Sequence, residues 1–202
     1  MTARRVRQDH SQKMARTYGM SKGQGFSLIE LLIVVAIILI IAAISIPGLL
    51  RARIAANESS AVSAIRDINT AEVSYQSAFP TVGYSADLGQ LGPGIAGSSC
   101  PAGGASSINA CLIDSALSNA ITATSAKSGY YYKETGVLGA GSTLFLTYGV
   151  GAAPAAFNQT GVRNFCSSED RVIHFNAGSS GALPQDGGRA ACTAAGGYPA
   201  LQ

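Results

Sequence analysis

The chain has 202 residues, which is room for one ordinary globular domain or for one domain with a membrane segment. Hydrophobic residues make up 47% of the chain and charged residues 12%, about half the share of charge that is usual in globular proteins. This composition argues against a freely soluble cytosolic enzyme.

The net charge of +3 averages two unlike parts of the chain. Six of the 14 lysines and arginines lie in residues 1–25 with one of the 11 acids, so 8 basic and 10 acidic residues remain from 26 to 202. The positive excess therefore belongs to a short amino-terminal piece and is no sign of nucleic-acid binding. Because this piece lacks hydrophobic periodicity, we predict that residues 1–25 form a basic leader, disordered over 1–24, that stays in the cytoplasm.

An uncharged apolar run from Leu31 to Leu50 follows the leader. As a helix its 20 residues would span about 30 Å, the hydrocarbon thickness of a bilayer, so we predict a membrane helix over residues 26–50. An ordinary secretory signal has its small-residue cleavage site after the apolar core. Here Gly25 comes before the core, so a cut at this glycine would leave the apolar segment on the mature chain. Pro47 removes a backbone donor and predicts a kink or local melting of the helix.

Residues 51–80 return to helical spacing beyond this proline. Apolar residues recur at steps of three, four or seven, and the charged residues, Glu58 among them, lie mostly off the stripe. The stripe consists of Ile54, Ala61, Ala64, Ile68, Ala71, Tyr75 and Ala78. We therefore predict one helix of about 50 residues that ends near Phe79–Pro80, and its amphipathic second half must lie against something because globular helices are much shorter.

Residues 81–128 are rich in Gly, Ser and Ala, which predicts a long surface connection with a short helix around Asn109–Asn119. Residues 129–202 contain four stretches with strand signals, separated by glycine-containing turns: GYYYKETG, STLFLTYGV, VRNFC and RVIHFN. Consecutive strands at hairpin distances predict an antiparallel sheet whose apolar face covers the amphipathic half of the long helix. The predicted fold class is therefore α+β, with a long amino-terminal helix packed on a carboxy-terminal antiparallel sheet.

The four cysteines all lie beyond residue 99: Cys100, Cys111, Cys166 and Cys192. An even number without CxxC spacing predicts disulfides in an oxidising compartment rather than a zinc site. Four reduced thiols in a cytosolic protein are the alternative. Three connectivities are open, and the simplest pairs near neighbours, Cys100 with Cys111 and Cys166 with Cys192.

The stretch GFSLIELLIVVAIILIIAAISIPGLL, residues 25–50, resembles the class III signal and spine helix of type IV pilins and pseudopilins. The resemblance rests on Gly25, the aromatic Phe26, Glu30 at its fixed offset and Pro47 within a membrane-length run. It implies cleavage after Gly25 by a prepilin peptidase, methylation of the new amine on Phe26, an assembly role for Glu30 and a bend of the spine at Pro47.

The same resemblance implies a structural protein, not an enzyme, with no cofactor and no metal. Identical subunits would leave the bacterial inner membrane, where the amino terminus is cytoplasmic, and pack by their spines into a helical pilus on the cell surface. An assembly platform and its ATPase would drive this step, and we expect no nucleic-acid partner.

Glu30 also has a physical reason to take part in assembly. A carboxylate inside a membrane costs on the order of 3 kcal/mol by insertion scales, so its presence calls for a partner or a purpose. Cleavage would create a positive amine on Phe26, four positions away in the sequence, and the two groups of neighbouring subunits would attract each other in a dry filament interior. The plainer alternative is that Glu30 lies at the interface and reaches water.

A pseudopilin of a type II secretion system is the main alternative function. Some pseudopilins use calcium in a carboxy-terminal loop, for which Glu169, Asp170 and Asp186 are the candidate ligands. The EF-hand spacing is absent, and two adjacent acids usually form a solvated turn.

Two further alternatives are a minor pilin that binds DNA and a membrane protein with an enzymatic external domain. Arg163, Arg171 and Arg189 are the candidate basic patch for DNA, without interleaved exposed aromatics. The mature region has one histidine, His174, with no acid or nucleophile at a motif spacing, so the sequence offers no carrier for catalysis.

Overall fold

The computed structural model describes residues 25–94, 100, 103–185, 188–193 and 197–201. The disorder predicted for the leader concerns residues 1–24, which lie outside the described residues. The chain divides into two compact units, Met1–Ala43 and Ile44–Gln202.

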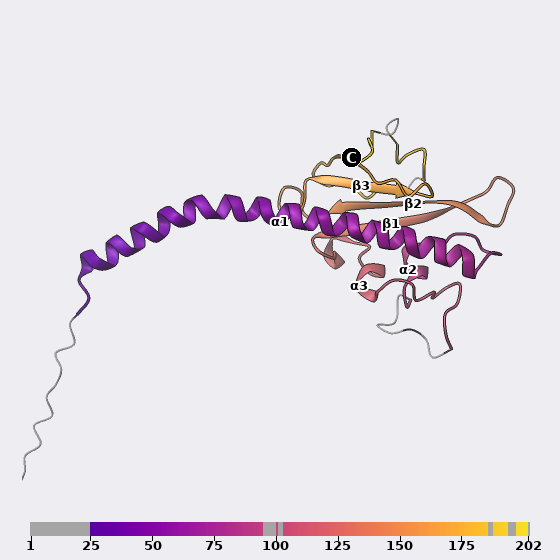
Figure 1. Ribbon diagram of the computed structural model, residues 1–202, viewed down its shortest axis with the longest axis horizontal. Helices are drawn as coiled ribbons and strands as arrows, with labels where there is room; N and C mark the ends of the chain where they lie inside the picture. Colours follow the sequence, from indigo (N-terminus) through magenta and orange to yellow (C-terminus); the bar gives the residue numbers. More distant parts are fainter. Residues whose placement is uncertain (1–24, 95–99, 101–102, 186–187, 194–196, 202) are drawn as a thin grey trace, which may run out of the picture. The chain divides into compact units, whose positions relative to one another are not determined.

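One long α-helix, α1 (Leu28–Ala78), contains 51 residues and runs through Pro47 without interruption (Figure 1). The long helix predicted from the sequence is therefore confirmed, and its end at Ala78 adjoins the predicted end at Phe79–Pro80. The bend expected at Pro47 stays a prediction.

The second half of α1 buries one face, as the apolar stripe predicts. Of the stripe residues, Ala61, Ala64, Ile68, Ala71 and Tyr75 are buried, whereas Ala78 is exposed. The buried face is wider than the stripe, because it also contains two apolar and three polar side chains: Val62, Ile65, Glu58, Asn69 and Glu72.

Four strands form one antiparallel sheet in the order β1-β2-β3-β4 (Figure 1). Their bounds are Tyr130–Leu138 for β1, Phe145–Pro154 for β2, Arg163–Ser168 for β3 and His174–Ala177 for β4. Each strand overlaps one of the four stretches that the sequence predicts. The α+β class and the packing of a long helix on an antiparallel sheet are confirmed.

Both faces of the sheet are covered. Neighbouring residues of a strand point to opposite sides, so two such residues in different clusters show what lies on each face. Phe165 of β3 belongs to the main core, together with Tyr132 of β1 and Ile68 of α1. The next residue, Cys166, belongs to a second and smaller cluster with Cys192. Helix α1 thus covers one face of the sheet, and the carboxy-terminal segment covers the other.

Residues 81–128 hold more structure than the sequence predicts. Helix α3 (Ser115–Ser118) falls where a short helix is expected, whereas helix α2 (Leu88–Leu91) and the 3-10 turn η1 (Ala123–Ser125) are not expected. The surface location predicted for this segment is wrong for four of its large apolar residues, which are buried in the main core: Leu88, Leu91, Ile113 and Leu117. Helices of four residues are too short to leave a periodic signal, so their inward-facing leucines escape a pattern search.

Two disulfides tie the loops to this core. Cys100 is joined to Cys111 and Cys166 to Cys192, and no cysteine is free in the described part of the chain. This is the local pairing that the sequence offers as the simplest of three. The second bridge connects β3 to the carboxy-terminal segment on the face of the sheet opposite α1.

Candidate functional site

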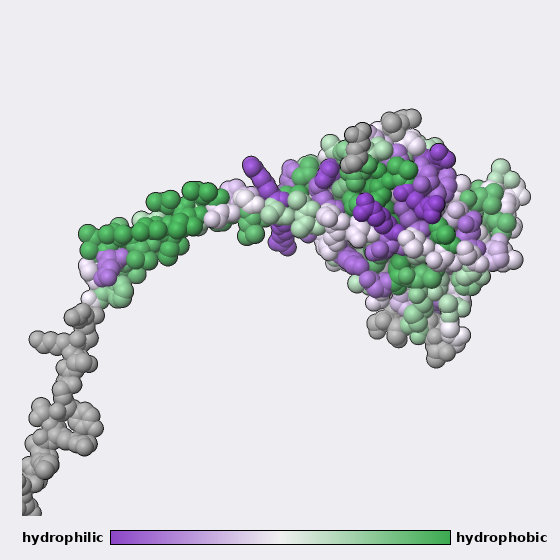
Figure 2. Space-filling view, in the orientation of Figure 1, coloured by the Kyte–Doolittle hydropathy of each residue, from purple (hydrophilic) through white to green (hydrophobic). Residues whose placement is uncertain are grey.

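The apolar amino-terminal part of α1 has no buried residue and is the candidate functional surface. Phe26 is 78% exposed and Leu28 80%, and the most apolar stretch of the helix has none of its residues buried. By length and composition α1 could cross a membrane, and Figure 2 shows its first part as a mostly hydrophobic surface with one hydrophilic patch near its start. Because soluble monomers rarely expose an apolar surface of this extent, this segment requires lipid or another protein around it.

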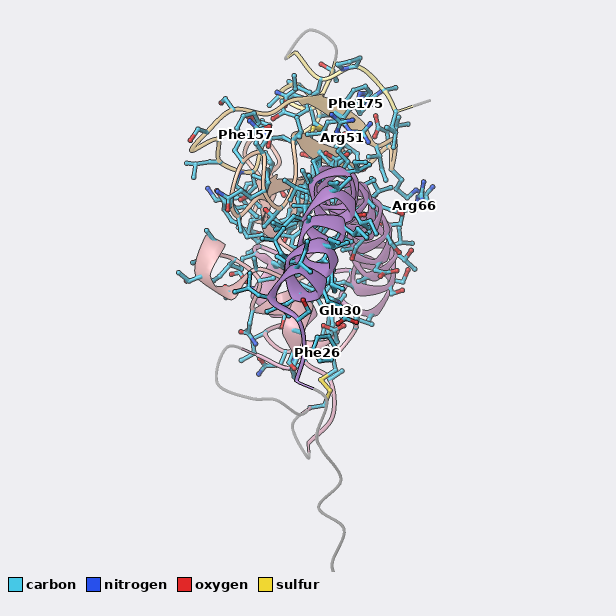
Figure 3. All side chains as sticks on the ribbon, turned by 90° about the vertical axis from the view of Figure 1, so that its left-hand side faces the viewer. Phe26, Glu30, Arg51, Arg66, Phe157 and Phe175 are labelled. Atoms are coloured by element: carbon cyan, nitrogen blue, oxygen red, sulfur yellow. A yellow bond between two sulfur atoms is a disulfide. The ribbon has the colours of Figure 1, made fainter. Side chains whose placement is uncertain are left out.

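Glu30 is the acid in the first turn of this helix. The carbonyl of Ser27 accepts hydrogen bonds from the backbone N–H groups of Glu30 and Leu31 at 3.1 and 3.2 Å, which closes the first turn. The Glu30 side chain is exposed, and Figure 3 shows it near Phe26 at the start of the helix. A carboxylate there interacts favourably with the positive end of the helix dipole.

Gly25 stands in open space, because a Cβ atom built on it would meet no heavy atom within 4 Å. Packing in the described structure therefore gives no reason for a glycine at this position. A requirement imposed by an external enzyme would explain the glycine, and the cleavage predicted after Gly25 would be such a requirement.

Glu58 is a charged residue whose role the helical stripe does not reveal. The sequence places it off the apolar face, but it is only 6% exposed. Its Oε2 accepts a hydrogen bond from Nε of Arg163 at 2.8 Å and lies 2.7 Å from Nη2 of the same residue. Its Oε1 accepts from the backbone N–H groups of Val162 and Arg163 at 3.0 and 3.1 Å. Glu58 therefore anchors α1 to the start of β3.

Two of the three arginines considered for DNA binding have acidic partners within the chain. Arg163 pairs with Glu58, and its guanidinium also lies 5.6 Å from the ring centroid of Phe175. Arg189 Nε lies 3.8 Å from Oδ2 of Asp170. Their charge is thus offset locally, which weakens the case for a basic patch.

A second buried acid, Glu72, meets Glu134 of β1 at one serine. Ser85 donates its backbone N–H to Glu72 Oε2 at 3.0 Å and its hydroxyl to Glu72 Oε1, and this hydroxyl lies 2.9 Å from Glu134 Oε2. The Ser85 hydroxyl therefore lies between the two buried carboxyls and has one proton to share between them. Burial raises the pKa of the Glu72 carboxyl above its ordinary value, although the hydrogen bonds from Ser85 lower it in part.

A buried amide completes the polar links between α1 and the sheet. Asn69 donates from Nδ2 to Ser167 Oγ of β3 at 2.9 Å, and its Oδ1 accepts from the Tyr148 hydroxyl of β2 at 2.9 Å. Burial raises the pKa of this tyrosine, so its hydroxyl keeps its proton at neutral pH. Sequence reasoning missed these links because each joins residues far apart in the chain.

Of the candidate calcium ligands, Asp170 has partners within the chain, whereas Glu169 Oε2 is buried without a hydrogen-bond partner in the described structure. Asp170 Oδ1 accepts from the Val172 N–H at 3.0 Å, and Asp186 lies outside the described residues. In the described ranges no three or more His, Cys, Asp or Glu residues gather in a metal-binding group. His174 Nδ1 lies 2.9 Å from the Tyr198 carbonyl, to which it donates.

A helix with an exposed apolar amino-terminal part and an amphipathic part packed on an antiparallel sheet defines a pilin-like protein. Residues 20–46 match the family model described as the prokaryotic N-terminal methylation motif. The chain therefore carries a prepilin-type amino terminus, and its fold is pilin-like.

One curated relative supports the same family. The type IV wide pilus major component PilA4 of Thermus thermophilus is 47% identical over 57 residues, which is 28% of this chain and 44% of that protein. The similarity thus spans less than half of the relative. No solved structure matches the chain.

Proposed function

We propose that this protein is the subunit of a type IV pilus. The observation that carries the proposal is the exposed apolar part of α1, which contains Glu30, directly follows Gly25 and Phe26 and has none of its most apolar stretch buried. Such a surface suits two environments in succession, the bilayer before assembly and the packed helices of other copies afterwards.

The processing steps follow from the same residues. A prepilin peptidase at the cytoplasmic face of the inner membrane cuts after Gly25, and the new amine of Phe26 is methylated. Glu30 then meets the Phe26 amine of a neighbouring copy during assembly. An assembly platform and its ATPase draw the subunits from the membrane, and the sheet domain stays outside the cytoplasm throughout.

Head-to-tail contacts that do not close into a ring give a helical filament. The curated relative is named as the major component of a wide pilus, which supports this geometry for a chain with a similar amino terminus. The disulfides Cys100–Cys111 and Cys166–Cys192 suit a domain that ends up outside the cell, because such bonds persist in oxidising surroundings.

Replacing the cleavage glycine tests the proposal. Gly25→Val places a branched side chain at the cut, and we expect an uncleaved precursor in the membrane and no surface filaments. Gly48→Ala is the matched control, because a Cβ atom at Gly48 also meets nothing within 4 Å. Mass spectrometry of the membrane fraction and electron microscopy of the cells provide the two readouts. Normal filaments from Gly25→Val cells would overturn the proposal.

A deletion strain separates this function from the pseudopilin alternative. Loss of long surface filaments with intact secretion supports the pilus subunit. Loss of protein secretion with intact filaments would assign the chain to a type II secretion system instead.

A further inference from the structure

Two exposed arginines follow the apolar run directly. The run ends at Leu50, and Arg51 and Arg53 come next, before Ile54, which is partly buried. Figure 3 labels Arg51 on the helix. Neither guanidinium forms a salt bridge within the described residues. The nearest acid along the helix, Glu58, is already held by Arg163. The positive charge of the two arginines is therefore left for a group outside the chain.

Their positions on the helix indicate what surrounds them. Two residues along an α-helix correspond to a rotation of about 200° about its axis. Arg51 and Arg53 therefore lie on nearly opposite sides of α1. Both are exposed, so the sheet domain covers neither. A protein partner docked on one side would reach one of them, whereas a bilayer surrounds a helix on all sides.

Their charge also runs against the usual bias of membrane proteins. Lysine and arginine near a span favour the cytoplasmic side, which the six basic residues of the leader satisfy. Arg51 and Arg53 lie at the other end of the span. Arginine on a long stem can place its guanidinium at the headgroups, where its planar fork binds phosphate oxygens in pairs.

We propose that Arg51 and Arg53 form a collar that binds the phosphates of anionic phospholipids in the outer leaflet of the inner membrane. The proposal rests on the membrane-anchored stage of the proposed function but not on cleavage or filament formation. The collar fixes how deep the subunit sits after the leader has been removed, when no other lysine or arginine lies between Phe26 and Leu50. Extraction into a filament then has to break these contacts.

Lipid binding by the full chain tests the collar. The protein in a neutral detergent is titrated with phosphatidylglycerol or with phosphatidylcholine, and bound lipids are counted by native mass spectrometry. For each arginine changed, Arg51→Gln or Arg53→Gln, we expect about a fivefold loss of apparent affinity for phosphatidylglycerol, and little change for phosphatidylcholine. The double variant should lose more than tenfold. The basic leader is common to all variants and cancels in the comparison.

The matched control is Arg66→Gln with Arg171→Gln, which removes the same charge from two exposed positions farther along the chain. We expect this variant to bind phosphatidylglycerol like the wild type. Equal lipid binding in the collar variant and the wild type would overturn the proposal, as would an equal loss in the control. A collar variant with normal lipid binding but fewer filaments would show instead that the arginines contact a neighbouring copy. Because the assay uses the uncleaved chain, it gives a result even if no pilus forms.

Discussion

Glu58 and Arg163, 105 positions apart in the sequence, join the long helix to the sheet, because Nε and Nη2 of the arginine both lie against Oε2 of the glutamate. One carboxylate oxygen accepts from the arginine, at 2.8 Å from Nε, and the other accepts from two backbone N–H groups at the start of β3. A buried charge is tolerated only where its hydrogen-bonding capacity is used, and here both oxygens are engaged. The pair therefore fixes where α1 lies along β3.

Removing the acid should cost more than removing the base. Glu58→Ala leaves the partly buried N–H groups of Val162 and Arg163 without their acceptor, so we expect a loss of about 2–3 kcal/mol in the free energy of unfolding. Arg163→Ala should cost only about 1 kcal/mol, because its side chain is 42% exposed and solvent screens its charge. Urea unfolding of the full chain in mild detergent, followed by circular dichroism, measures both.

Arg66→Ala is the control for this comparison, since Arg66 is exposed on the same helix. It should change the free energy of unfolding by less than about 0.5 kcal/mol. A smaller loss for Glu58→Ala than for Arg163→Ala would contradict the role given to the backbone hydrogen bonds.

The same pair marks the limit of prediction from the sequence. The length of α1, its end near Phe79 and the four strands follow from local patterns, because apolar spacing and glycine turns are visible within a few residues. The apolar stripe of the helix predicts Glu58 to be a solvent-facing charge. Its burial depends on Arg163 and on the backbone at the start of β3, which lie too far along the sequence for any local pattern to include them.

The candidate site divides in the same way. The exposed segment with Phe26 and Glu30 is recognisable because its signal is local and continuous. The leucines of α2, at Leu88 and Leu91, are buried in the core although their surroundings read as a polar connection. A four-residue helix capped by Asp87 places them inward, and this depends on the tertiary fold more than on periodicity.

Stability should fall as the pH rises because of Glu72. Burial raises the pKa of Glu72, so the folded protein favours the protonated carboxyl more than the unfolded chain does. The stabilisation is full below the ordinary pKa of 4.5 and is lost as the pH rises through the higher folded value. We expect the urea midpoint of the wild type to decrease from pH 4.5 upward.

Glu72→Gln tests this assignment, because glutamine keeps an acceptor for Ser85 and has no charge to bury. The midpoint of this variant should change less with pH than that of the wild type. Asp67→Asn, an exposed acid on the same helix, should follow the wild type. If the wild type and Glu72→Gln have parallel pH profiles, the buried pair does not titrate in this range.

The disulfides should contribute unequally. Cys166–Cys192 closes 26 positions and Cys100–Cys111 closes 11, so the chain-entropy relation gives about 3.5 and about 2.8 kcal/mol. Both sulfurs of the longer bridge are buried in the second cluster, which adds the loss of packing when they are removed. We expect Cys166→Ala with Cys192→Ala to lower the thermal midpoint more than the other double variant does. The reverse order would contradict the structural importance of the carboxy-terminal segment.

Glu30 should control assembly without controlling membrane insertion. Glu30→Gln keeps the shape of the side chain and removes the charge, so insertion should be unchanged or improved, because a neutral amide costs less than a carboxylate in an apolar segment. The attraction to the Phe26 amine of a neighbouring subunit is lost at the same time. We therefore expect normal amounts of processed protein in the membrane and at least tenfold fewer filaments.

The ratio of sheared surface filaments to membrane-bound subunit, measured by immunoblot, separates these two effects. Glu30→Asp is the matched control, because it keeps the charge on a side chain shorter by one methylene group and should assemble better than Glu30→Gln. Ser45→Ala, a second polar position in the apolar run, should leave the ratio unchanged. An unchanged ratio in Glu30→Gln would mean that the carboxylate merely reaches water at the membrane surface, and that subunit register is fixed by the packing of the apolar helices alone.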